Sequence, residues 1–318
     1  MSTDKRRVAL TLAETLTAVV VCAVLGAALL RAMRHVLLLT TRFSNHTLAW
    51  ERGQNALSLL EPRVLHTALG LTWERGGEKF QRSFGAGSPS APPPARWSGG
   101  PLQVWRGYPT LTTIAPEEAG VCRGRGIVLL YAVPSLLRAK TLDNAPVSMD
   151  EARRIELVPG ENLTQITERL VTGDRTDLWS WVVFPLTNLP VHVKEYSGGR
   201  VTLQGAENSG LSATLFPYDE MHYLRGERFQ VQHDRLYSEN LRQSWTSLQP
   251  RLDGVLETWF EFTPSKRLLD AWILAAGGPA AFGRGARPPE WPADAPWRDA
   301  FERYDLAVVR ASWLVRNF

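Results

Sequence analysis

The 318-residue sequence predicts an α+β protein, in which one long N-terminal helix packs on a β-rich globular head. Two observations support this fold class. The mainly apolar run from Val8 to Leu30 carries one charge, Glu14, and it is long enough to cross a membrane as a helix. Beyond residue 74, short segments rich in strand-forming residues are separated by Gly and Pro. A long helix followed by many strands is typical of an α+β fold.

The first part of the helix is expected to cross a lipid bilayer. Its 23 apolar-run residues would form roughly 34 Å of helix, and the hydrocarbon core of a bilayer is about 30 Å thick. Basic residues at positions 5–7 come directly before this run, which favours a cytoplasmic N-terminus and an extracytoplasmic head. Arg31, Arg34 and His35 are expected to mark the exit from the bilayer. We therefore assign residues 10–34 to the transmembrane half.

The second part, residues 35–73, is expected to be an amphipathic half of the same helix that covers the head. Apolar residues recur there at spacings of three and four, namely Leu57, Leu60, Val64, Ala68 and Leu71. Pro62 is expected to kink this helix or to begin a new segment, because an interior proline costs about 3 kcal/mol. The alternative is a helix of the soluble domain that is not connected to the first.

The head is expected to span residues 74–318 and to consist mainly of strands. Seven segments have strand character: 126–132, 179–184, 191–196, 200–204, 228–232, 258–263 and 305–315. Ser197-Gly198-Gly199 predicts a hairpin turn between the third and fourth of these segments. Two Pro/Gly-rich stretches, 85–101 and 277–296, are predicted to be loops because they suit neither a helix nor a central strand.

Composition narrows the possible partners. The net charge is +4, and residues 4–7 of the leader supply half of it, so the remainder of the chain is nearly neutral. No clustered basic face suited to nucleic acid is evident, and no nucleic-acid partner is predicted. Cys22 and Cys122 fall in the membrane run and in the head, so no disulfide within the chain is expected.

The sequence does not predict an enzyme, a cofactor or a metal site, and no catalytic residue is proposed. The six histidines lack metal-binding spacing, and neither a nucleophile elbow nor a phosphate-binding loop is found. Cys122–Gly126 is interpreted as a surface turn and Asp219–Glu220 as part of a solvated loop. Trp179 and Trp181 are placed on one face of a strand, where core packing is favoured over stacking on a carbohydrate.

The N-terminal sequence resembles a known processing signal. A basic leader, the small residue Ala9, the apolar Leu10, Thr11-Leu12-x-Glu14 and a long apolar helix resemble the signal of type IV prepilins and type II secretion pseudopilins. The resemblance implies that prepilin peptidase removes the leader, residues 1–9, by cutting between Ala9 and Leu10. It also implies N-methylation of Leu10 and a role for Glu14 in a charge pair between subunits. The family has Gly and Phe at the cut, where this chain has Ala9 and Leu10.

Three later segments are similar to the PilW family and to minor pseudopilin J: Phe229–Tyr237, Leu252–Phe262 and Val315–Phe318. The resemblance implies a minor pilin or pseudopilin, a structural subunit of a type IV pilus or a type II secretion pseudopilus. It would be a single-pass protein of the bacterial inner membrane. Its partners would be prepilin peptidase, other minor subunits, the inner-membrane assembly platform and the lipid bilayer. The alternative is a bitopic protein with an uncleaved signal anchor and a periplasmic binding head.

Overall fold

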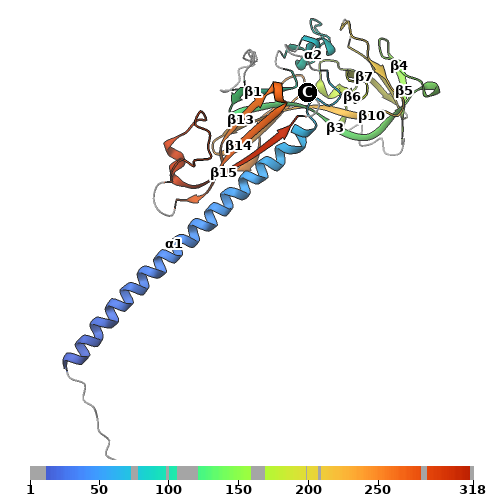
Figure 1. Ribbon diagram of the computed structural model, residues 1–318. Coiled ribbons are helices and arrows are strands. Elements are labelled where there is room, and N and C mark those ends of the chain that lie inside the picture. The colour runs from blue at the N-terminus through green and yellow to red at the C-terminus, as the bar shows by residue number, and fades with distance from the viewer. Residues whose placement is uncertain are drawn as a thin grey trace, which may run out of the picture.

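The computed structural model describes residues 12–72, 78–97, 100–105, 121–158, 169–197, 199–206, 209–280 and 285–315. Helix α1 (Leu12–Leu65) projects far from a strand-rich head, which packs on its C-terminal part (Figure 1). At 1.5 Å per residue, its 54 residues form about 81 Å of helix. The predicted long apolar helix with a β-rich body is thus confirmed. The length of α1 follows from a sequence that has no proline before Pro62.

The helix ends earlier than the sequence predicts, at Leu65 rather than at residue 73. Pro62 does not begin a new segment, because α1 continues through it to Leu65; it lies in the last turn and removes a hydrogen bond only near the end. The chain then leaves the helix to pair with a strand. Thr67 forms a bridge with Tyr131, and the Ala68 N–H donates to the Leu130 carbonyl. The competing strand pairing, rather than the proline, sets the boundary.

Six strands of the head close into a ring. The order of antiparallel neighbours is β3 (Gly126–Lys140), β5 (Arg153–Val158), β8 (Arg200–Gln204), β7 (Pro190–Ser197), β6 (Trp181–Val183) and β10 (Glu220–Gln232), and β10 pairs again with β3. The result is a small antiparallel barrel. Its interior is filled with apolar side chains, including Phe184, Val193 and Leu203. The barrel lies at the end of the head away from the bare part of α1 (Figure 1).

Strands β3 and β10 continue beyond the barrel into a second part of the head. There β1 (Leu102–Trp105) pairs with β3, and β11 (Arg235–Leu241) joins β10 to β12 (Gln249–Asp253). A separate sheet has the order β15 (Tyr304–Leu314), β14 (Leu268–Pro279), β13 (Val255–Thr263) and β2 (Cys122–Gly124). Helix α1 packs mainly on β14 and β15. The shared core holds Leu60 of α1, Ile273 of β14 and Phe229 of β10.

Shorter elements cover the remaining apolar surfaces. Helix α2 (Glu78–Ser83) and the 3-10 helix η1 (Pro93–Arg96) place Phe80, Phe84 and Ala95 against the outside of the barrel. The chain around η5 (Asp299–Arg303) covers the outer face of β13 and β14 with Trp291 and Phe301. Two further 3-10 turns, η2 (Leu142–Asn144) and η4 (Pro264–Lys266), and the strand pair β4 (Val147–Ser148) and β9 (Thr214–Leu215) complete the head.

The strand predictions hold for most segments, with extended boundaries. A turn joins β7 and β8 as predicted, although residue 198 lies outside the described residues. The predicted strand 228–232 is the end of β10, and a two-residue turn joins it to β11. His233 and Asp234 both adopt positive φ in this turn, 47° and 58°, as a two-residue hairpin turn requires.

The predicted loop at 277–296 is partly wrong, because β14 extends through Gly277 and Gly278 to Pro279. These two glycines are strand residues that allow a close approach of α1. A Cβ atom on Gly277 would overlap the Asn45 backbone, and one on Gly278 would overlap the Asn45 side chain. The Gly277–Gly278 pair, which the sequence predicts to be part of a loop, therefore forms a contact surface for α1.

Candidate functional site

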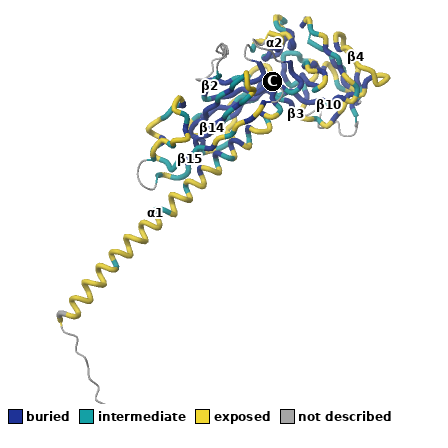
Figure 2. The backbone as a smooth tube through the Cα atoms, viewed as in Figure 1, coloured by how far each residue is buried: buried dark blue, intermediate teal, exposed yellow. Residues whose placement is uncertain are grey.

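The exposed part of α1 is the most unusual surface of the molecule. Its side chains up to Leu48 are almost all exposed, although most are apolar (Figure 2). Large exposed residues include Leu16, Val20, Leu29, Leu30, Val36, Leu37 and Phe43. The helix is long and apolar enough to span a membrane. Glu14 lies in its first turn and is exposed. Ala9 and Leu10, the predicted processing residues, lie outside the described residues.

The exposed apolar surface is longer than a bilayer requires. It runs from Leu12, which is 87% exposed, to Trp50, which is 50% exposed. These positions are about 57 Å apart along the axis, whereas the hydrocarbon core is about 30 Å thick. The head begins to cover the helix only near Asn45 and Ala49. A bilayer core could therefore cover only part of this surface, and Phe43, 71% exposed, is not covered by the head.

The contact between α1 and the head begins with polar groups of the helix. The Asn45 amide donates to the Pro279 carbonyl at 3.1 Å and to the Asp305 carboxylate at 2.9 Å. Two turns further, Arg52 Nη1 donates to the carbonyls of Ala276 and Gly277 at 2.7 and 3.2 Å. These bonds engage carbonyls of β14 from Ala276 onward, beyond the point where its pairing with β13 ends at Ala275. They fix α1 along its length relative to the sheet.

A buried carboxylate holds the last turn of α1. Glu227 of β10 is 1% exposed, and it accepts from Arg63 Nε at 2.5 Å and from the Tyr131 hydroxyl at 3.1 Å. Arg251 of β12 approaches the same carboxylate at 3.5 Å. Burial opposes the charge of Arg63, but the neighbouring Glu227 raises its pKa overall. Burial, and then the charge of Glu227, raise the pKa of Tyr131. Removing one partner of such a pair costs about 3–5 kcal/mol, because the other charge stays buried.

A second buried carboxylate joins the two sheets. Glu257 of β13 is paired with Arg125, the residue between β2 and β3, and Arg298 lies at 3.8 Å. Burial raises the pKa of Glu257, while the bonds from Arg125 oppose that rise. The predicted surface turn at Cys122–Gly126 is therefore wrong. This segment passes from one sheet to the other, and Gly126 leaves room for the Trp105 ring.

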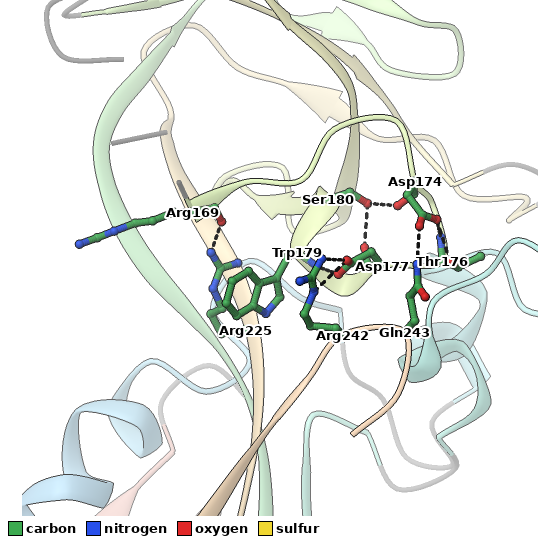
Figure 3. Close-up of polar contacts among 9 residues, drawn as sticks. All are labelled: Arg169, Asp174, Thr176, Asp177, Trp179, Ser180, Arg225, Arg242 and Gln243. Carbon is green, nitrogen blue, oxygen red and sulfur yellow. Dashed lines mark hydrogen bonds and ion pairs between the residues drawn. The ribbon is translucent and has the colours of Figure 1, made fainter. Parts of the chain in front are cut away.

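Trp179 is the centre of a polar cluster on the barrel (Figure 3). It lies in the 3-10 helix η3 (Leu178–Ser180), whereas Trp181 begins β6 and is buried, so the two do not share a strand face as predicted. The guanidinium groups of Arg225 and Arg242 lie 4.4 and 5.1 Å from the Trp179 ring centroid. Such cation–π contacts are each worth about 0.5–2 kcal/mol. They support a packing role for Trp179.

The rest of this cluster is engaged within the protein. Asp177 caps η3 by accepting from the Trp179 N–H at 2.9 Å, and it is paired with Arg242. Arg225 donates to the carbonyls of Leu224 and Arg169. Burial lowers the pKa of Arg225 to about 10. Asp174 receives bonds from Thr176 and Gln243. The cluster holds a loop of the barrel in place.

Asp219 and Glu220 differ from the predicted solvated loop. Asp219 is buried and accepts from the Leu186 N–H at 2.9 Å, and burial raises its pKa. Glu220 begins β10 and lies 3.8 Å from His222. Within the described ranges, no three His, Cys, Asp or Glu side chains form a group that could hold a metal ion. The buried acids thus link segments of the head.

Comparisons with protein families, characterised proteins and solved structures found no match for this chain.

Proposed function

We propose that this protein is a minor pilin or pseudopilin, a membrane-anchored structural subunit for assembly of a type IV pilus or a type II secretion pseudopilus. The observation that carries the proposal is the division of α1 into an exposed apolar part and a part seated on a β-rich head. The prepilin-like signal around Ala9, Leu10 and Glu14 is consistent with this division. An isolated anchor would need only about 20 apolar residues.

The exposed surface beyond the bilayer also supports assembly. Val36, Leu37 and Phe43 are each at least 60% exposed, and large apolar patches of this kind mark contacts with other molecules. Neighbouring helices of the same type would cover them in a bundle. In this proposal the head lies outside the inner membrane. Prepilin peptidase, other minor subunits and the inner-membrane assembly platform are its partners.

Processing tests the proposal against an uncleaved signal anchor. When the protein is produced together with prepilin peptidase, its mature N-terminus should be a methylated Leu10. A bulky Ala9→Leu substitution should block the cut, because the enzyme's site takes a small residue there. Ala13→Leu adds the same side chain outside the cut and serves as the control. Wild-type protein that keeps residues 1–9 in the presence of the enzyme would contradict the proposal.

A further inference from the structure

The whole excess of positive charge lies at the start of the chain. Residues 1–42 contain six Lys or Arg and two Asp or Glu, which equals the net charge of +4 for the complete sequence. Three of these cations, Arg31, Arg34 and Arg42, follow the apolar run on α1. Between Glu14 and Glu51 the helix has no acidic residue. A local positive field is therefore present just beyond the membrane segment.

The first cations form a stripe on one face of the helix. Residues three or four positions apart lie on the same side of a helix. The side of α1 that contacts the head includes Leu60, Ala56, Gly53, Ala49 and Asn45. Toward the N-terminus this side continues through Arg42, Leu38, His35 with Arg34, and Arg31. We call Arg31, Arg34 and His35 the basic stripe. It lies on the face of α1 that carries the head further along. Val36, Thr40 and Phe43 occupy the other side of the helix.

The stripe also lies at the height of lipid phosphates. Arg31 is 17 positions after Glu14, or about 26 Å along the axis, close to the thickness of the hydrocarbon core. Arg34 is about 5 Å further, within the headgroup layer. Both arginine side chains are exposed. Their planar guanidinium groups match phosphate oxygens in shape and charge.

We propose that Arg31 and Arg34 bind the phosphate of an anionic phospholipid on the head-bearing face of α1. The proposal rests on the proposed function only in that α1 crosses a bilayer. Lipid held on this face fixes the rotation of the helix about its axis. The opposite face, with Val36 and Phe43, then remains turned toward other subunits. Arg42 is about 17 Å beyond Arg31, and it lies above the headgroup layer.

Native mass spectrometry of the full chain in detergent tests this proposal, with phosphatidylglycerol or phosphatidylcholine added as the probe. The wild type should retain phosphatidylglycerol in preference to phosphatidylcholine. Each arginine near an anionic lipid surface contributes roughly a fivefold difference in affinity over a zwitterionic lipid. Arg34→Gln should therefore reduce the preference about fivefold, and Arg31→Gln with Arg34→Gln about 25-fold. Equal retention of the two lipids by the wild type would overturn the proposal.

Exchanging two residues without changing the net charge tests whether the side of the helix that carries the cation matters. Arg34→Val combined with Val36→Arg keeps the composition and moves one cation to the other side. This variant should lose phosphatidylglycerol preference as Arg34→Gln does, and wild-type retention would contradict the assignment to this face. Membrane insertion is measured separately by flotation of vesicles. A chain that does not float with vesicles would disprove the transmembrane helix itself, whereas a chain that floats without lipid preference would disprove only the basic stripe.

Discussion

At the scale of single residues, Glu14 is the position where the proposed assembly gives the sharpest expectation. Removal of the leader would leave a charged amine on Leu10 in the same membrane as the Glu14 carboxylate. In a bundle, the carboxylate of one subunit can pair with the amine of the next. Breaking a buried pair costs about 3–5 kcal/mol, because the remaining charge is stranded. The charge of Glu14 would therefore select partners in the correct axial register.

Glu14→Ala should leave membrane insertion intact and weaken association with other minor subunits. A loss of about 3 kcal/mol corresponds to more than a hundredfold weaker association. Co-purification of partner subunits from detergent measures this effect. Glu51→Ala, in the same helix but beyond the bilayer, is the matched control and should recover partners as the wild type does. Equal recovery with Glu14→Ala would remove any pairing role for this residue.

His192 should make the free energy of unfolding of the head depend on pH. Burial, and then the charges of Arg175 and Lys194, lower the pKa of His192 to about 4, from an ordinary value near 6.5. Between these values the unfolded chain binds a proton that the folded chain does not, so the free energy of unfolding falls as the pH falls. The loss between pH 7 and pH 5 should be about 2 kcal/mol.

Denaturant unfolding followed by tryptophan fluorescence at pH 7 and pH 5 measures this loss. His192→Leu removes the titrating group and should show a smaller difference between the two conditions. Burial also raises the pKa of Glu257 and Asp219, which gives the opposite pH dependence. Comparing the wild type with His192→Leu cancels that contribution, because both proteins contain the same two carboxyls. An identical pH dependence in wild type and variant would assign the effect to other groups.

At the scale of elements, the contact between α1 and the sheet depends on glycines, which have no side chain to keep the two elements apart. A Cβ on Gly53 would lie 2.5 Å from Val309 Cγ2, and one on Gly277 would overlap the Asn45 backbone. Gly26, in the bare part of the same helix, has open space around it. Three Gly→Ala substitutions therefore differ in what the new methyl group meets.

Gly26→Ala should be neutral or slightly stabilising, because alanine is the better helix former by about 1 kcal/mol. Gly53→Ala should destabilise the contact by about 1–3 kcal/mol through overpacking, and Gly277→Ala by at least as much because backbone cannot move aside easily. Hydrogen exchange over residues 49–65 reports the contact directly. Unchanged protection in Gly277→Ala would show that α1 is not held by this approach.

The sequence predicts elements better than it predicts their contacts. Local signals predicted the long helix and seven of the fifteen strands in the described part of the chain. These signals are the apolar run, the spacing of Leu57, Leu60 and Val64, and the alternating strand segments. Strand β14 was missed because its Ala-rich and Gly-rich end resembles a loop, whereas its glycines serve the distant Asn45. The Arg63–Glu227 pair joins residues 164 positions apart. No spacing along the chain could predict that pair.

At the scale of the whole molecule, the head and the bare helix are built for different surroundings. The head pairs its buried Glu227 and Glu257 with arginines and closes a barrel. The bare helix exposes apolar side chains from Leu12 to Phe43, about 47 Å along its axis, whereas the hydrocarbon core of a bilayer is about 30 Å thick. The chain therefore combines a head whose apolar side chains are mostly buried with a helix whose apolar side chains are mostly exposed. This contrast is the physical reason for proposing that the chain assembles with other subunits.

Site-specific photo-crosslinking at Phe43 tests the central claim most directly. A photoreactive residue there lies beyond the bilayer core and away from the head, and the same residue at the exposed Leu142 of the head is the control. In cells with the assembly machinery, the account predicts crosslinks from position 43 to other proteins with prepilin-type N-termini. It predicts no such crosslinks when Glu14→Ala is added. A position 43 that crosslinks to no such protein, although the chain is inserted and processed, would contradict the account.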